Sequence, residues 1–118
     1  MTHLPELNKK LDDAVLAGKA LEAFDELYAD DVVMQENNDA PFVGKEFNRN
    51  REIEFFNSIA DLHSASVLSS GVGVDVSFSE WEMDVTFKNG YRLKLNQTAV
   101  RRWKDGKIVH ERFYYSKA

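Results

Sequence analysis

Hydrophobic residues recur at helical spacing at the start of the chain. Leu4, Leu7, Leu11 and Val15 follow one another at steps of three and four residues, which predicts one amphipathic helix of about 12–14 residues. Gly18 is its natural end, because glycine enters the left-handed conformation at a helix C-terminus without steric cost.

Two more helices are expected before residue 60. An apolar stripe over residues 21–28 predicts a second helix that ends at the two aspartates of residues 30–31, and a strand begins at Val32. Residues 35–41 are rich in Asn, Asp and Pro, which is typical of a loop. A third helix is expected from Gly44 to about residue 59.

From residue 62 onward the pattern has a period of two, which indicates strands. Hydrophobic residues occupy even positions from 72 to 78 and odd positions from 81 to 87. Because a shift of one residue turns a side chain to the opposite face of a sheet, this change predicts a β-bulge or a sharp bend at Ser79 and Glu80.

Two hairpins are expected near the C-terminus. Residues 88–90, Lys-Asn-Gly, predict a three-residue loop that sets Val85 opposite Leu93. A two-residue loop would instead set Val85 opposite Lys94, which mixes apolar and charged faces. Residues 105–106, Asp-Gly, predict the second hairpin.

The order of elements predicts an α+β fold in one domain that covers residues 1–118. Three N-terminal helices would pack on one face of a strongly curved antiparallel sheet, leaving a cone-shaped cavity, which is a default ligand site. The chain is 43% hydrophobic and has 14 aromatic residues, enough for a packed core.

Charge and composition narrow the partners. The net charge of −5 argues against nucleic acid or an anionic membrane as the main partner. The absence of cysteine excludes disulfides and thiolate metal sites, and no two histidines have a spacing suited to a metal, so neither metal nor cofactor is expected. No apolar stretch approaches about 18 residues and the N-terminus lacks the pattern of a signal peptide, so a cytoplasmic location is expected.

Three segments resemble one known family. They are residues 27–33, Leu-Tyr-Ala-Asp-Asp-Val-Val, residues 41–46, Pro-Phe-Val-Gly-Lys-Glu, and residues 102–109, Arg-Trp-Lys-Asp-Gly-Lys-Ile-Val. Together they are similar to the SnoaL-like family of the nuclear transport factor 2-like superfamily, and the element order agrees over nearly the whole chain. The resemblance implies the cystatin-like cone fold. It does not imply one activity, because the superfamily includes isomerases, cyclases, dehydratases and binding proteins.

The resemblance to ketosteroid isomerases of this superfamily concerns Glu36. Counted from residues 28–31, Glu36 falls where those enzymes carry an aspartate general base, and a carboxylate in an apolar cavity mouth can abstract a proton next to a carbonyl group. The isomerases also use a protonated aspartate and a tyrosine as donors, and these fall here on Ala99 and near Leu11 and Asp12, so neither the aspartate nor the tyrosine is present at its position. The isomerase mechanism is therefore not implied, and Glu36 can equally be a solvated loop residue.

Two charged residues on the last strands are expected to meet. If odd-numbered side chains face the cavity, Arg101 and Glu111 lie on neighbouring strands within reach of a charge-assisted pair. The pair would either bind a ligand carboxylate or carbonyl group, or serve only as a cross-strand ion pair. The side chains expected to contact a ligand are Tyr28, Phe56, Trp81, Met83, Gln97, Arg101, Glu111, Phe113 and Tyr115.

Other polar groups have weaker interpretations. His63, at the start of the first long strand, is either an acid–base group or an ordinary half-buried residue. Asp12 and Asp13 are expected on a solvated helix surface. The outer face of the sheet is expected to form a homodimer, with Val100, Trp103 and Tyr114 as its apolar patches.

Three functions follow from these patterns. The first is a protein that binds a small, largely apolar molecule in the cone. The second is an isomerase, cyclase or dehydratase with Glu36 or His63 as general base. The third is a protein-interaction module that uses the outer sheet face.

Overall fold

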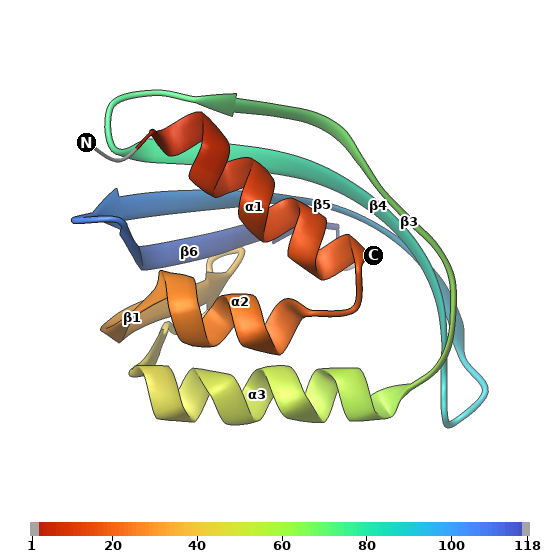
Figure 1. Cartoon of the computed structure of the whole chain (residues 1–118). Coiled ribbons are helices and arrows are strands. Elements are labelled where there is room, and N and C mark those ends of the chain that lie inside the picture. Colours follow the sequence, from red (N-terminus) through yellow and green to blue (C-terminus); the bar gives the residue numbers. More distant parts are fainter. Residues whose placement is uncertain (1–2, 117–118) are drawn as a thin grey trace.

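The computed structural model describes residues 3–116. Three helices and six strands follow one another along the chain (Figure 1). Their bounds are α1 Leu4–Leu16, α2 Ala20–Leu27, β1 Tyr28–Glu36, β2 Phe42–Val43, α3 Lys45–Ser58, β3 Ile59–Val72, β4 Val76–Phe87, β5 Arg92–Lys104 and β6 Lys107–Tyr115. Among the described residues, no helix is both long and apolar enough to cross a membrane.

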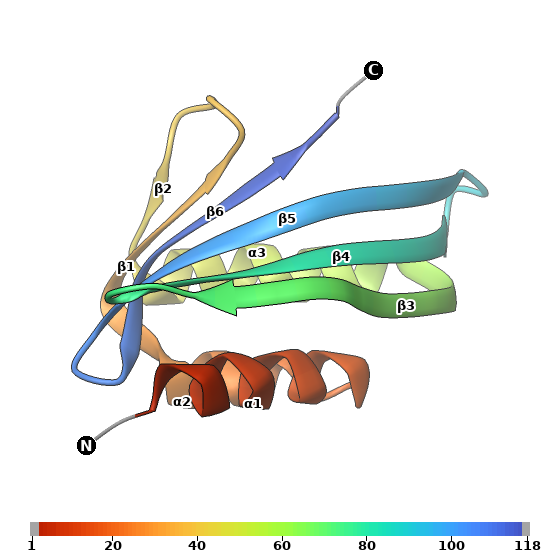
Figure 2. The same cartoon turned by 90° about the horizontal axis from the view of Figure 1, so that it is seen from above.

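The strands form one sheet in the order β2-β1-β6-β5-β4-β3. The long strands bend around the helices (Figure 1), and α1 and α2 lie together on one side of the sheet (Figure 2). The α+β fold with three helices on a curved sheet is confirmed. The sheet is mixed, however, because β1 pairs with β6 in parallel. The two strands are far apart in sequence, and therefore no hairpin forces them to be antiparallel.

Helix α1 ends as its sequence predicts. Gly18 has φ of +77°, its N–H donates to the carbonyl of Val15, and the N–H of Lys19 donates to the carbonyl of Ala14. This is the double hydrogen bond of a Schellman motif, which satisfies two carbonyl groups that the helix end leaves free.

Helix α2 ends three residues earlier than expected. Tyr28 is already extended, with φ −101° and ψ 136°, so Asp30 and Asp31 lie exposed in β1 and do not terminate the helix. The ring of Tyr28 stacks on Phe24 with centroids 4.4 Å apart. Helix and strand are thus joined without a loop, by a residue that belongs to the core of both.

The expected hairpin registers are confirmed. Val85 lies opposite Leu93, and Gly90 takes φ of +91° in the three-residue loop. At the second hairpin, Asp105 and Gly106 both have positive φ, as a tight two-residue turn between strands requires. Arg101 lies opposite Glu111 on the paired strands, as the alternation predicts.

The bulge expected at Ser79 and Glu80 does not lie on β4, because the register shift at this point is on the partner strand β3, between Val67 and Ser69, opposite Trp81 and Glu80. Strands β4 and β5 pair without a shift from Val76 to Thr86, and odd positions face inward along the whole of β4. Ser77 and Ser79 are buried and polar, whereas Phe78 is partly exposed. The prediction failed because it treated hydrophobic residues as the inward ones, and here buried hydroxyl groups with hydrogen-bond partners replace them. The bulges lie in the pairing of β3 with β4.

A second irregularity lies on β6. Arg102 pairs with His110 and Trp103 with Ile108, so one extra residue, Val109, sits between the two pairs. This bulge turns Ile108 inward, and neither Ile108 nor Trp103 is more than 5% exposed. Trp103 is therefore a core residue and not part of an outer apolar patch.

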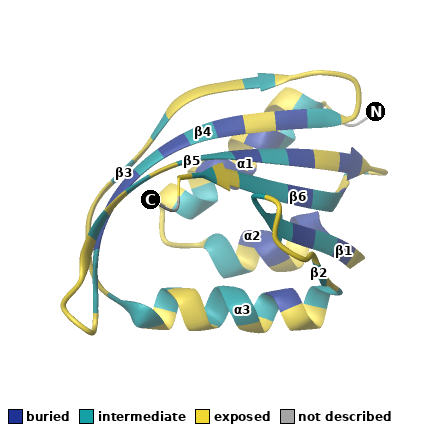
Figure 3. Cartoon of the chain, turned by 180° about the vertical axis from the view of Figure 1, so that it is seen from behind, coloured by how far each residue is buried: buried dark blue, intermediate teal, exposed yellow. Residues whose placement is uncertain are grey.

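The core lies between α1, α2 and the strands β1, β5 and β6 (Figure 3). Its fully or nearly fully buried members are Leu11, Ala23, Phe24, Leu27, Tyr28, Val32, Met34, Trp103 and Ile108. The other end of the sheet, where β3 to β5 curve away, carries fewer buried residues (Figure 3). This uneven packing leaves space between the sheet and the helices.

Two glycines with positive φ provide a test of the backbone. Gly44, which precedes α3, has φ of 101° and ψ of 142°, a region that only glycine occupies readily, whereas Gly18 is in the left-handed helical region that asparagine tolerates. A Cβ at either position meets no atom within 4 Å, so sterics against neighbours do not differ. Gly44→Asn should lower the free energy of unfolding by about 2 kcal/mol, and Gly18→Asn by less than about 1 kcal/mol, in urea titrations. Equal losses would contradict the backbone assignment.

Candidate functional site

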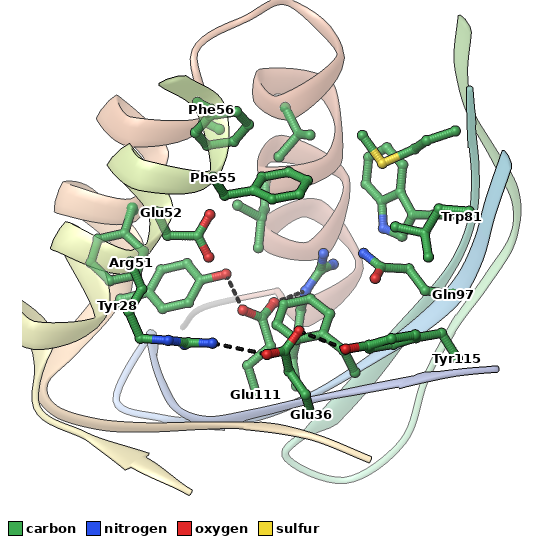
Figure 4. A pocket seen from close by; sticks show the side chains of 18 of the residues that line it. Tyr28, Glu36, Arg51, Glu52, Phe55, Phe56, Trp81, Gln97, Glu111 and Tyr115 are labelled. Atoms are coloured by element: carbon green, nitrogen blue, oxygen red, sulfur yellow. Dashed lines mark hydrogen bonds and ion pairs between the residues drawn. The ribbon is translucent and has the colours of Figure 1, made fainter. Parts of the chain in front are cut away.

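A cavity of about 360 Å³ lies between the helices and the curved sheet. Its walls are mainly apolar, and polar groups gather at one end of it (Figure 4). The lining residues are Leu11, Val15, Ala20, Phe24, Tyr28, Glu36, Arg51, Glu52, Phe55, Phe56, Trp81, Met83, Leu93, Leu95, Gln97, Arg101, Glu111, Phe113 and Tyr115. All nine side chains expected to contact a ligand, and Glu36, lie in this lining.

A buried arginine forms the base of the polar end. The side chain of Arg101 is 3% exposed, and its Nε donates to Oε2 of Glu111 at 2.9 Å. Its Nη1 donates to Oδ1 of Asp12, also at 2.9 Å. One guanidinium therefore faces two carboxylates, and an ion buried in this way is stable only when paired and hydrogen-bonded.

The partner from α1 was not predicted. Asp12 was expected on a solvated helix surface, but it is 5% exposed and faces the sheet. Asn8, one helical turn earlier, accepts hydrogen bonds from Arg101 and Ser77 at 2.8 Å each. The spacing of four residues places both side chains on one helix face. Asn8 and Asp12 lie next to the apolar stripe of α1. Their burial could therefore have been predicted only if the strands that contact them were known.

Tyr28 completes the group around Glu111. Its hydroxyl donates to Oε1 of Glu111 at 2.6 Å. Burial, together with the negative charge of Glu111, holds the pKa of Tyr28 well above its usual range. Tyr28 therefore stays a neutral donor, and both oxygens of Glu111 are engaged, one by Tyr28 and one by Arg101.

Glu36 lies at the cavity with partners on both oxygens. Oε2 accepts from Nη2 of Arg51 at 3.0 Å and Oε1 accepts from the hydroxyl of Tyr115 at 2.9 Å (Figure 4). Burial and the hydrogen bond to Glu36 raise the pKa of Tyr115 to about 12. The guanidinium of Arg51 also lies 3.6 Å from the ring centroid of Phe42. Glu36 is thus a fixed, charge-paired carboxylate and not a free loop residue.

Glu52, which the sequence did not single out, points into the cavity from α3 (Figure 4). Burial, and after it the negative charge of Glu111, raise the pKa of Glu52 to about 7. Among residues 3–116, no donor gives its carboxylate a hydrogen bond. The residue was missed because α3 carries acidic and basic residues on several faces, so no periodic signal separates an inward glutamate from an outward one.

His63 lies elsewhere. It is exposed on β3, its Nε2 lies 2.7 Å from Oγ1 of Thr86, and it does not line the cavity. The described residues hold no group of three side chains suited to a metal ion. The polar groups that line the cavity include three carboxylates, from Glu36, Glu52 and Glu111, two tyrosine hydroxyls and the amide of Gln97.

Removing the buried guanidinium should strongly destabilise the fold. Arg101→Met leaves Asp12 and Glu111 buried without their cation, which costs about 3–5 kcal/mol for such a pair. Arg102→Met, on the exposed face one position away, should cost less than about 0.5 kcal/mol. Chemical denaturation at pH 7 measures both. A loss for Arg101→Met no larger than that of its neighbour would contradict the pairing.

The raised pKa of Glu52 predicts a pH-dependent gain in stability on its removal. Folding raises the pKa of this carboxyl group from 4.5 to about 7, so the folded state is destabilised wherever the unfolded state is ionised. This loss of folding free energy is small below pH 4.5, grows between pH 4.5 and pH 7, and is complete above pH 7. Glu52→Gln should therefore be more stable than the wild type by about 3 kcal/mol at pH 8, and by less than about 0.5 kcal/mol at pH 4.5. Urea titrations at both pH values measure this difference.

The control for this experiment is Glu54→Gln, an exposed residue of the same helix. It should change the free energy of unfolding by less than about 0.5 kcal/mol at both pH values. A difference at Glu52 that does not depend on pH would mean that its carboxylate is not desolvated.

Comparison with known proteins places this cavity in a known fold. A SnoaL-like protein from Mesorhizobium loti, described as a candidate polyketide cyclase and also as a carbohydrate phosphatase, is 27% identical, with a TM-score of 0.85 over 97% of this chain and 100% of that one. A nuclear transport factor 2-like protein of unknown function from Burkholderia pseudomallei is 15% identical, with a TM-score of 0.82 over 98% and 92%.

A third similar structure is AclR from Streptomyces galilaeus, described as a candidate hydroxylase. It is 15% identical, with a TM-score of 0.78 over 95% of this chain and 87% of that one. Among curated proteins, none matches the sequence. The SnoaL-like domain family matches residues 4–115, which is nearly the whole chain, and the protein is therefore a member of the SnoaL-like family, with the fold of nuclear transport factor 2-like proteins.

Proposed function

We propose that this protein binds a small, largely apolar molecule in the cavity between its helices and its sheet. The observation that carries the proposal is the cavity itself, whose volume of about 360 Å³ falls within the range of ligand sites, about 300–1,000 Å³. A protein that acts only through its outer surface has no need of such a space.

The apolar walls support a ligand with an apolar body. Aromatic side chains such as Phe55, Phe56 and Trp81 line the upper part of the cavity in Figure 4, and aliphatic ones come from α1 and β5. Displacing water from such walls contributes about 25 cal/mol per Å² of apolar surface buried.

The polar end supports hydrogen bonding more than binding of an anion. Arg101, the residue expected to hold a ligand carboxylate, already faces the carboxylates of Glu111 and Asp12. Arg51 is paired with Glu36. Both guanidinium groups of the lining are therefore neutralised within the protein, and an anionic ligand would meet carboxylates before it met a free cation.

A second candidate function is acid–base catalysis on a carbonyl compound, of the isomerase, cyclase or dehydratase kind. Its support is the position of two carboxylates, Glu36 and Glu52, in one apolar cavity. Glu36 is held by Arg51 and Tyr115 and suits a positioning role, whereas the pKa of Glu52, raised to about 7 by burial, suits proton transfer.

The third candidate, a homodimer or partner interface on the outer sheet face, rests on exposed apolar side chains. Phe78 and Tyr114 are 38% and 44% exposed. Single exposed hydrophobic residues are common on soluble proteins, so this surface carries less weight than the cavity does.

A cavity-filling variant tests the proposed function. Leu95→Trp places a large side chain in the cavity, and Lys94→Trp places the same side chain on the exposed face of β5. Thermal-shift and calorimetric titrations with neutral molecules of about ten heavy atoms, such as naphthol, indole and benzyl alcohol, should find ligands of the wild type. Leu95→Trp should weaken their binding at least tenfold, and Lys94→Trp less than twofold.

Circular dichroism verifies that both variants are folded. If no neutral apolar molecule of this size binds the wild type at millimolar concentration, or if the two tryptophan variants weaken binding equally, the cavity is not the binding site.

A further inference from the structure

The cavity of this protein carries an excess of negative charge at its polar end. Three carboxylates line it, and a fourth, from Asp12, lies directly behind Arg101. Only two guanidinium groups face them. If every group is ionised, two negative charges remain unbalanced, although the surrounding walls are apolar.

The excess is not shared equally among the carboxylates. Glu36 has Arg51 and Tyr115 as partners, and Glu111 has Arg101 and Tyr28. Within the described part of the chain, only Glu52 among the lining carboxylates accepts no hydrogen bond and forms no ion pair. Its oxygens point into the cavity (Figure 4), where a ligand would lie.

Aromatic side chains flank this carboxylate. Phe55 and Phe56 follow Glu52 on α3 after two residues, and Tyr28 faces it from β1 (Figure 4). The faces of aromatic rings attract cations, and an unpaired carboxylate with rings beside it is the arrangement that binds an organic ammonium group. A metal ion is less suited, because it requires several oxygen ligands and Glu52 is the one lining carboxylate without a partner.

We propose that the ligand of this cavity is an organic cation, a protonated amine on an apolar body, whose ammonium group binds the carboxylate of Glu52. This inference rests on the proposed function and adds the chemical class of the ligand. The apolar body would contact the aromatic and aliphatic walls. The ammonium group would supply the charge and the hydrogen-bond donors that Glu52 lacks.

Several charged and titratable groups face Glu52 from the elements packed around it. They are Tyr28 and Glu36 on β1, Arg51 on α3, Arg101 on β5, and Glu111 and Tyr115 on β6. Burial, and after it the negative charges of Glu111 and Glu36, raise the pKa of Glu52 to about 7 against the opposing effect of Arg51. Below about pH 7, binding of an ammonium group must then release a proton from Glu52. The affinity of the protein for the ammonium ligand should therefore fall as the solution becomes more acidic.

The test compares three molecules of one shape by isothermal titration calorimetry. Benzylamine is protonated across the range used, benzyl alcohol is its neutral counterpart, and benzoate is its anionic counterpart. At pH 8 the wild type should bind benzylamine at least tenfold more tightly than either of the others. At pH 5.5 this preference should shrink at least fivefold, because Glu52 is then protonated.

Two variants and a proton count sharpen the result. In Glu52→Gln, benzylamine and benzyl alcohol should bind within about twofold of each other at both pH values. Glu54→Gln, the exposed neighbour on the same helix, should retain the preference of the wild type. Titrations at pH 6.5 in buffers of different ionisation enthalpy should show release of about 0.7 proton per benzylamine bound.

The outcomes separate this inference from the proposed function. If benzyl alcohol binds as tightly as benzylamine, or benzoate binds most tightly, the ligand is not a cation, but the cavity remains a binding site. A preference for benzylamine that survives in Glu52→Gln would place the cation elsewhere. If none of the three binds, the inference is overturned, and the screen with neutral apolar molecules then decides the proposed function.

Discussion

The rest of the structure depends on how the buried guanidinium of Arg101 is paired. Its two carboxylate partners come from opposite ends of the chain, Asp12 from α1 and Glu111 from β6. Because a buried ion tolerates neither a missing partner nor a wrong distance, this contact fixes where α1 lies on the sheet and how β5 and β6 are aligned. The apolar side chains of the core then pack between the elements that this ion pair holds in place.

The same pairing explains the character of the cavity. By neutralising Arg101 within the protein, Asp12 and Glu111 remove the cation that a ligand anion would need. The aromatic and aliphatic walls follow from the curvature of β3 to β5, which bend away from the helices. Glu52, on α3, is then the one lining carboxylate among the described residues that has no partner within the protein.

Much of this fold could be predicted from local patterns. The end of α1 at Gly18, the three-residue hairpin that sets Val85 opposite Leu93, and the alignment of Arg101 with Glu111 all follow from spacing and turn chemistry. The features that were missed involve polar groups that are buried. Ser77 and Ser79 are polar although they lie on the inward face of β4, so the hydrophobic pattern did not identify that face.

The site was predictable in its lining and not in its chemistry. Strand alternation placed Gln97, Arg101 and Glu111 in the cavity, because a strand has two faces and one of them is apolar. Asp12 and Glu52 could not be found in this way, since a charged residue on an amphipathic helix is solvated in most proteins. Only the position of the partner elements shows that Asp12 is buried and that Glu52 is half-buried in the cavity wall.

The reach of the Arg101 contacts also bears on the order in which the chain can fold as it is made. The hydrogen bonds from Arg101 to Asn8 and Asp12 join residues 93 and 89 positions apart. A growing chain exposes α1 from the start, but the strands that receive it emerge last. The helix therefore cannot make these contacts until β5 has left the ribosome, and the pairing of Arg101 with α1 must form late in synthesis, whatever α1 contacts before then.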